Sequence, residues 1–233
     1  MSNTEGHRAL EPFRFHTRLH LRELTGLKAR NLEGLLSHIK SVPGSVIYHH
    51  THHFLQQHQY LTPEPPNDFA YWVTEVLQEK RLGERLASID ICDYGTIRAL
   101  REKVISTIES YLEKTKGELK QVGEGEEFHF IKSISFIFPT PYEAHDLGEF
   151  ISILQKVTVD SIYYHVFEAR IRLEKGTNDF SAWFENSLGE KELAKQVAKL
   201  DPYTHTMEGL RKKIIHLVEN RYMKENLAKE GPP

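Results

Sequence analysis

An internal duplication constrains the fold of this chain more than any other feature of its sequence. The segment NDFAYWVTEVL at 67–77 recurs as NDFSAWFENSL at 178–188, with five identical residues at an offset of 111 (178 − 67). Self-similarity over such a distance indicates two copies of one structural unit. We therefore predict two similar units in tandem.

Further matches set the limits of the two copies. LREKVISTIESY in the first half parallels LRKKIIHLVENR in the second, and both copies open with phenylalanines at alternate positions. The first unit is predicted to span 13–114 and the second 128–224. Residues 115–127, which are rich in Gly and Glu and lack apolar periodicity, are predicted to form a linker.

The spacing of apolar residues predicts the secondary structure of each unit. The opening phenylalanines, Phe13 with Phe15 and Phe128 with Phe130, indicate a short strand. Apolar residues then recur every three or four positions, which is typical of helices, and TPYE at 140–143 matches a helix start. The predicted class is mainly α: two similar helical units, each with a short β-strand at its start, packed about a pseudo-two-fold axis.

Composition and charge exclude several classes of function. The formal net charge is −3 with basic and acidic residues interspersed, so no nucleic-acid partner is expected. The N-terminal segment lacks a signal-peptide pattern and no apolar run is long enough to cross a bilayer, which predicts a cytoplasmic protein without a membrane partner. Cys92 is the single cysteine, so any metal would need nitrogen and oxygen ligands.

The stretch SVIYHHTHHFLQQH at 45–58 is rich in histidine. On a helix, three of these side chains project within an arc of about 100°, so their imidazoles can converge on zinc, iron, nickel or manganese. Two acidic residues in or after the following loop are candidate oxygen ligands. The candidate metal ligands are His49, His52, His53, Glu64 and Asp68.

Two other interpretations of the same stretch remain open. The histidines can hydrogen-bond to surrounding aromatic and carboxylate groups, because a buried neutral imidazole needs partners for both ring nitrogens. Alternatively, they can line a polar pocket for a small ligand, with an aromatic ring as a stacking face. The candidate ligand-binding residues are His49, His50, His52, His53, His58, Tyr71 and Trp72.

The second copy offers an internal comparison for the histidines. Aligning SVIYHH with SIYYHV pairs His49 with His165 and His50 with Val166, at an offset of 116 (165 − 49). The first copy thus carries histidines at positions where the second is partly apolar. We expect one unit to carry a site and the other to support it. His20, on the first strand segment, is expected to be solvated.

Other polar residues that recur in both copies favour structural roles. Asn67 and Asn178 are predicted N-caps, because a short side-chain oxygen can accept from the amides of the first helical turn. The aromatic residues that follow them are expected on the inward face. Arg101 and Arg211, at equivalent positions, are predicted to tie helices together.

Three long segments carry a resemblance to a known family. FHTRLHLRELTGLKARNLEGLL, SVIYHHTHHFLQQHQYLTPEPPNDFAYWV and LGERLASIDICDYGTIRALREKV resemble an uncharacterised bacterial protein family described only as a domain of unknown function. The resemblance covers nearly the whole chain. It implies no activity, cofactor or catalytic residue.

The sequence favours a binding protein over an enzyme without deciding between them. No nucleophile–base pair, glycine-rich phosphate loop or dinucleotide fingerprint is evident. The leading prediction is a cytosolic accessory or regulatory protein that binds a small molecule or a protein partner at its histidine-rich helix. The alternatives are a metal-dependent hydrolase, with Glu64 or Asp68 as general base, and a structural subunit of a complex. The sequence sets no oligomeric state.

Overall fold

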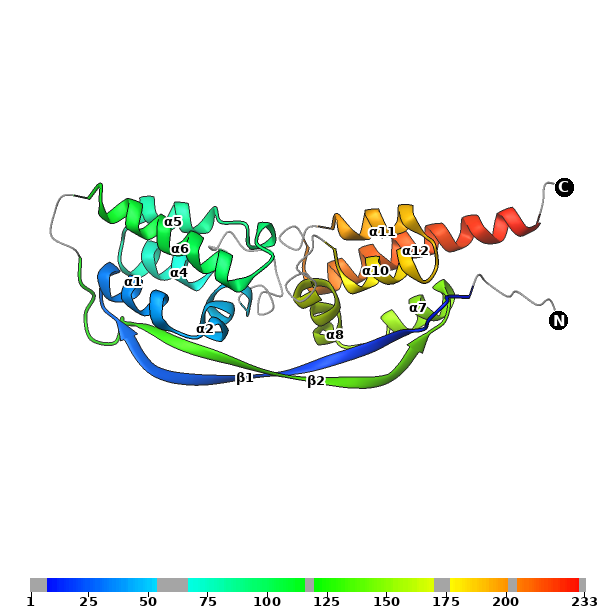
Figure 1. The fold of residues 1–233 in the computed structure, drawn as a ribbon, viewed down its shortest axis with the longest axis horizontal. Coiled ribbons are helices and arrows are strands. Elements are labelled where there is room, and N and C mark those ends of the chain that lie inside the picture. Colours follow the sequence, from blue (N-terminus) through cyan, green and yellow to red (C-terminus); the bar gives the residue numbers. More distant parts are fainter. Residues whose placement is uncertain (1–7, 54–66, 116–119, 170–176, 201–204, 231–233) are drawn as a thin grey trace. The chain divides into compact units, whose positions relative to one another are not determined.

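The computed structural model describes residues 8–53, 67–115, 120–169, 177–200 and 205–230. Its sheet consists of two antiparallel strands, β1 (Phe13–Ala29) and β2 (Phe128–Ala144), each 17 residues long. The helices of each unit cover one face of the strand segments in that unit (Figure 1). The predicted mainly α class is therefore wrong, because the strands extend far beyond the opening phenylalanines and the fold is mixed α and β.

The length of β2 also overturns a helix start that we predicted. Residues 140–143, TPYE, lie inside β2, and helix α7 begins only at Leu147 with the carboxylate of Asp146 accepting from the Glu149 amide. Prolines are tolerated here because each strand of a two-stranded sheet has one unpaired edge, where a missing N–H breaks no ladder bond. A Thr-Pro-x-Glu pattern fits a helix start and an edge strand equally well.

Helices and helical turns follow each strand in the same order. After β1 come α1 (Leu32–Ser41), α2 (Gly44–Tyr48), η1 (His49–His53), α4 (Asp68–Tyr71), η2 (Trp72–Val76), α5 (Lys80–Ala87), η3 (Ile91–Asp93) and α6 (Ile97–Leu112). After β2 come α7 (Leu147–Leu154), α8 (Val159–Tyr163), η4 (Tyr164–Glu168), α10 (Asp179–Asn186), α11 (Lys191–Ala198) and α12 (Met207–Glu230). None of the helices in these described ranges combines the length and apolar character that a membrane crossing requires.

The chain forms two compact units whose boundaries fall inside the strands. Unit 1 comprises Met1–Leu19 and Phe136–Pro233, and unit 2 comprises His20–Ser135. Unit 1 thus joins the start of β1 to the helices of the second repeat, whereas unit 2 joins the start of β2 to the helices of the first repeat. Each repeat has exchanged its opening strand residues with the other.

Aromatic packing shows the exchange directly. In unit 1, the ring of Phe13 lies 5.2 Å from that of Phe180 and 5.6 Å from that of Trp183, centroid to centroid. In unit 2, the ring of Phe128 lies 5.3 Å from that of Phe69 and also packs against Trp72. The opening phenylalanines of one repeat therefore complete the core formed by the helices of the other.

The predicted structural roles of the recurring polar residues are confirmed. The side chains of Asn67 and Asn178 cap α4 and α10 by accepting from the amides of Ala70 and Ser181. The Arg101 guanidinium donates to the Val42 carbonyl, and the Arg211 guanidinium donates to the carbonyls of Leu154 and Val157. These arginines tie the long helix of each unit to the end of its first helix.

Candidate functional site

The histidine-rich stretch forms a π-helical turn rather than an α-helix. α2 begins after Pro43 and passes directly into η1, and η4 continues α8 in the same way. A π turn is bonded from residue i to residue i+5, which widens the turn and shifts the side chains relative to α-helical spacing. The predicted convergence of His49, His52 and His53 assumed α-helical spacing.

The structure also corrects the alignment of the two copies. β1 and β2, α2 and α8, and η1 and η4 all correspond at an offset of 115 (128 − 13, 159 − 44 and 164 − 49). His165 is therefore the counterpart of His50 (165 − 50 = 115), not of His49. Identity between the short strings SVIYHH and SIYYHV had suggested 116, one residue too many. The counterpart of His49 is Tyr164.

His50 and His165 make the same contacts in their two units. His50 Nε2 accepts from the Ile131 amide (2.9 Å), and His50 Nδ1 lies 2.7 Å from Asp68 Oδ2. His165 Nε2 accepts from the His16 amide and its Nδ1 lies 2.8 Å from Asp179 Oδ2.

These contacts set the protonation of both rings. Because Nε2 accepts, Nδ1 must carry the proton and donate it to the carboxylate. Each histidine thus ties the first residue of a helix to a strand amide, which is a structural role shared by the two copies.

His49 belongs to a polar network in unit 2. Its Nδ1 lies 3.2 Å from Ser133 Oγ, and the same hydroxyl lies 3.1 Å from His20 Nε2. His20 Nδ1 in turn lies 3.2 Å from Ser135 Oγ, and the rings of His20 and His49 stack. His20, which was expected to be solvated, is half-buried and has both ring nitrogens within hydrogen-bond distance of serine hydroxyls.

Burial holds His49 in its neutral form. Its side chain is almost completely covered, and burial lowers the pKa of His49 from 6.5 to about 4, helped by the neighbouring His50 and opposed by Asp68. A neutral imidazole can take part in hydrogen bonds as both donor and acceptor. The network therefore relies on His49 remaining uncharged at neutral pH.

Unit 1 fills the corresponding space with an ion pair. Arg18, the counterpart of Ser133 (133 − 18 = 115), has a fully buried side chain that pairs with Glu168 and lies over the ring of Tyr163, 4.1 Å from its centroid. The same fold thus accommodates two different buried polar arrangements. In unit 2 the described residues at this place are imidazoles and a hydroxyl, whereas in unit 1 they are an arginine and a carboxylate.

Three of these groups in unit 2 are close enough to surround a metal ion. One ligand atom from each of His49, His50 and Asp68 lies within 4.8 Å of the other two, and in the described part of the chain no other group of three His, Cys, Asp or Glu residues meets this criterion. Imidazole nitrogen and carboxylate oxygen suit zinc, iron, nickel and manganese. Because Nδ1 of His50 carries a proton, a metal would have to displace that proton.

The other residues that the sequence predicted for this site either lie apart from the cluster of His49, His50 and Asp68 or are not among the described residues. His52 Nδ1 lies 2.8 Å from Thr51 Oγ1 and its ring stacks on Tyr48, whereas the Tyr71 side chain is exposed. Trp72 is buried, and its indole donates to the Glu126 carbonyl as that of Trp183 donates to the Glu11 carbonyl. His53 belongs to η1 but its side chain is outside the described part, as are His58 and Glu64 entirely.

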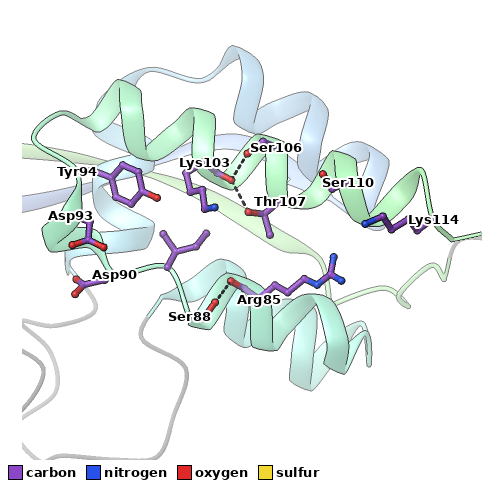
Figure 2. A pocket seen from close by; sticks show the side chains of 11 residues that line it. Arg85, Ser88, Asp90, Asp93, Tyr94, Lys103, Ser106, Thr107, Ser110 and Lys114 are labelled. Carbon is purple, nitrogen blue, oxygen red and sulfur yellow. Dashed lines mark hydrogen bonds between the residues drawn. The ribbon is translucent and has the colours of Figure 1, made fainter.

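A second candidate site lies elsewhere in unit 2, and sequence inspection missed it. A cavity of about 630 Å³ opens between α5, the segment 88–94 and α6. Figure 2 shows Asp90, Asp93 and Tyr94 at one end and Lys114 at the other, with Lys103 between them. The residues that line it are Arg85, Ser88, Ile89, Asp90, Asp93, Tyr94, Lys103, Ser106, Thr107, Ser110 and Lys114.

Three cations of this cavity are not engaged by carboxylates. Among the described residues, Arg85, Lys103 and Lys114 form no ion pair. The hydroxyls of Ser106 and Thr107 donate to the Lys103 carbonyl of their own helix, at 3.0 and 2.7 Å. Their oxygen lone pairs can still accept, and a hydroxyl can rotate toward a bound acceptor. The cavity thus offers three cations that form no ion pair among the described residues, beside polar groups and the carboxylates of Asp90 and Asp93.

The second repeat lacks most of this lining. At an offset of 110, given by the caps Thr96 and Thr206, Lys103 and Lys114 correspond to Lys213 and Lys224. The three hydroxyl residues of α6, by contrast, are not retained. Ser106, Thr107 and Ser110 correspond to His216, Leu217 and Asn220, and Arg85 corresponds to Gln196 at the α5 to α11 offset of 111. The sequence did contain a signal for this difference: LREKVISTIESY in the first repeat carries hydroxyl residues that LRKKIIHLVENR in the second repeat lacks.

The pKa of His49 predicts how unit 2 responds to acid. The unfolded state binds a proton near pH 6.5 but the folded state only near pH 4, so metal-free protein should lose stability as the pH falls between these values. Denaturant titrations at pH 7.5 and 5, followed by Trp72 fluorescence in a Trp183→Phe background, measure this loss. His49→Tyr, which installs the residue of unit 1, should flatten the dependence. Equal acid sensitivity in both proteins would show that another group is responsible.

Comparisons with known proteins agree with the fold and name no activity. A family model described as "Family of unknown function (DUF5752)" matches residues 10–219. The chain is similar to OrfY from Thermoproteus tenax, with a TM-score of 0.77 and 27% sequence identity over 91% of this chain and 96% of that chain. No curated protein matches at a significant level.

Proposed function

The chain belongs to the family of unknown function DUF5752, and we propose, from the cavity of unit 2, that it is a cytoplasmic accessory protein that binds a small anionic ligand. The observation that carries this proposal is the set of three cations, Arg85, Lys103 and Lys114, which line one cavity without carboxylate partners among the described residues. Cations that form no ion pair repel one another, and a bound anion offsets that repulsion.

A phosphate group is the anion that suits this lining best. Arginine presents a planar fork of donors and lysine a compact charge, and proteins use both for phosphate. Hydroxyl side chains on α6 add neutral donors on one wall. The volume of about 630 Å³ falls within the range of small-molecule sites and exceeds what an inorganic ion requires.

Binding of inorganic phosphate to the full-length chain tests the proposal. By titration calorimetry at low ionic strength, Lys103→Gln should weaken phosphate binding about tenfold, because it removes one charge-assisted hydrogen bond. Lys213→Gln is the matched control, since it removes an equally exposed lysine from the equivalent position of α12, which lacks the hydroxyl row. Equal weakening by both changes, or no binding by the unmodified chain, would contradict the proposal.

The cluster of His49, His50 and Asp68 supports a second candidate function, the binding of a divalent transition metal. Three protein ligands leave a coordination position open, as in catalytic rather than structural metal sites. This candidate competes with the hydrogen bonds of His50, which its counterpart His165 also makes. For that reason it ranks second.

Elemental analysis of tag-free protein, purified without chelator and then incubated with zinc, iron, nickel or manganese, tests the second candidate. If the cluster binds a metal, the unmodified chain should hold about one metal ion, and His49→Tyr should lose it. The control His165→Gln, which changes the counterpart of His50 in unit 1, should retain it. Metal that persists in His49→Tyr, or no uptake at all, would leave the histidines with the hydrogen-bonding role that their contacts describe.

A further inference from the structure

The cavity of unit 2 carries charges of both signs, which restricts the ligand further. Asp93 lines the cavity opposite the cationic end and, among the described residues, makes no ion pair. Figure 2 places Asp93 beside Asp90, with Tyr94 at the same end of the cavity, while Arg85 and Lys114 lie toward the other end. A single anion would satisfy only one end of this lining.

We propose that the ligand is a phosphate ester that also bears an amine, with the phosphate at Arg85, Lys103 and Lys114 and the ammonium at Asp93. This assignment rests on the anion site proposed above and extends it to the opposite end of the same cavity. An ammonium donates up to three hydrogen bonds and supplies the charge that a carboxylate attracts. The amine therefore gains more from Asp93 than a neutral hydroxyl does.

The duplication shows that the charge pair is particular to unit 2. The segment SIDICDYGT, which carries Asp93, corresponds to the shorter KLDPYTHT in the second repeat. Asp93 belongs to the part of this segment that differs in length, whereas Asp90 and Tyr94 are matched by Asp201 and Tyr203. Asp93 and the hydroxyl row thus distinguish the first repeat from the second, although the lysines of α6 and α12 are retained.

Two phosphate esters that differ in one group test the assignment. The amine probe is O-phosphoethanolamine, and the control probe is glycerol 3-phosphate, which carries hydroxyls in place of the amine. We expect the full-length chain to bind O-phosphoethanolamine about tenfold more tightly in titration calorimetry near neutral pH, because one ion-paired hydrogen bond is gained. Asp93→Asn, which keeps the shape of the side chain, should abolish this preference, because it removes the carboxylate that only the amine probe can pair with.

The outcomes separate this inference from the proposed function. If both esters bind equally, or if glycerol 3-phosphate binds more tightly, the amine assignment is wrong while the anion site stands. If Asp93→Asn weakens both esters alike, Asp93 shapes the cavity and does not select the amine, which also overturns the assignment. If neither ester nor inorganic phosphate binds, the anion site itself fails.

Discussion

Phe15→Ala should destabilise the helices of the second repeat, and not those of the repeat to which Phe15 belongs. The Phe15 side chain is 1% exposed, and its ring packs against those of Phe150 and Phe180, at 5.6 and 6.1 Å between centroids. Removing a buried phenyl ring leaves a cavity and costs about 3–5 kcal/mol. Because the strand is exchanged, that loss falls on unit 1.

The two tryptophans report the units separately, since Trp183 lies in unit 1 and Trp72 in unit 2. In protein labelled with 5-fluorotryptophan, fluorine NMR gives each residue its own signal during a urea titration. Phe15→Ala should move the Trp183 transition to lower urea while the Trp72 transition stays nearly in place.

Phe130→Ala is the matched variant, because Phe130 is the counterpart of Phe15 and is equally buried in unit 2. It should move the Trp72 transition by a similar amount. A Phe15→Ala effect confined to Trp72 would mean that each repeat keeps its own strand, and the exchange would then be wrong.

Arg18→Ala is expected to have an effect of similar size for a different reason. The guanidinium of Arg18 has no exposed surface, pairs with Glu168 and lies over the ring of Tyr163. Truncation removes the Arg18 cation from beside Glu168, whose side chain is 16% exposed, and breaking a buried pair in this way costs about 3–5 kcal/mol. The Trp183 transition in urea measures the change.

A double variant separates the loss of charge pairing from the loss of packing. Arg18→Met with Glu168→Gln removes both charges and keeps most of the volume, so it should recover much of the stability lost in Arg18→Ala. Replacing a whole buried pair is often nearly neutral, whereas orphaning one partner is not. If the double variant is as unstable as Arg18→Ala, the ion pair is not the source of the effect.

The sequence identified part of the histidine cluster and missed its surroundings. His49, His50 and Asp68 were named as candidates, and they do lie together. Ser133 and His20 were missed because they come from strands far away in sequence, and only the pairing of β1 with β2 brings them to η1. His52 lies in a π turn, whose wider spacing shifts side chains relative to an α-helix, and the prediction of convergence had used α-helical spacing.

The cavity of unit 2 shows a different limit of prediction from sequence. Arg85 lies on α5, Lys103 lies on α6 and Lys114 follows the end of α6, and charged residues on an exposed helix face are ordinary. Only the packing of α5 and the segment 88–94 beside α6 turns that face into the wall of a cavity. The loss of the hydroxyl residues in the second repeat was visible in the sequence. It indicates a difference between two binding surfaces only when the structure shows that these residues line a cavity in unit 2.

The sequence by itself determined the duplication, the caps at Asn67 and Asn178 and the inward aromatic faces, because these depend on local spacing and on short-range hydrogen bonds. Tertiary structure alone decided which strand completes which core. Both repeats open with phenylalanines at alternate positions, and both sets of helices present a similar aromatic face, so either strand can fill either core. The exchange is settled by the long antiparallel pairing of β1 with β2, whose free energy depends on residues more than a hundred positions apart.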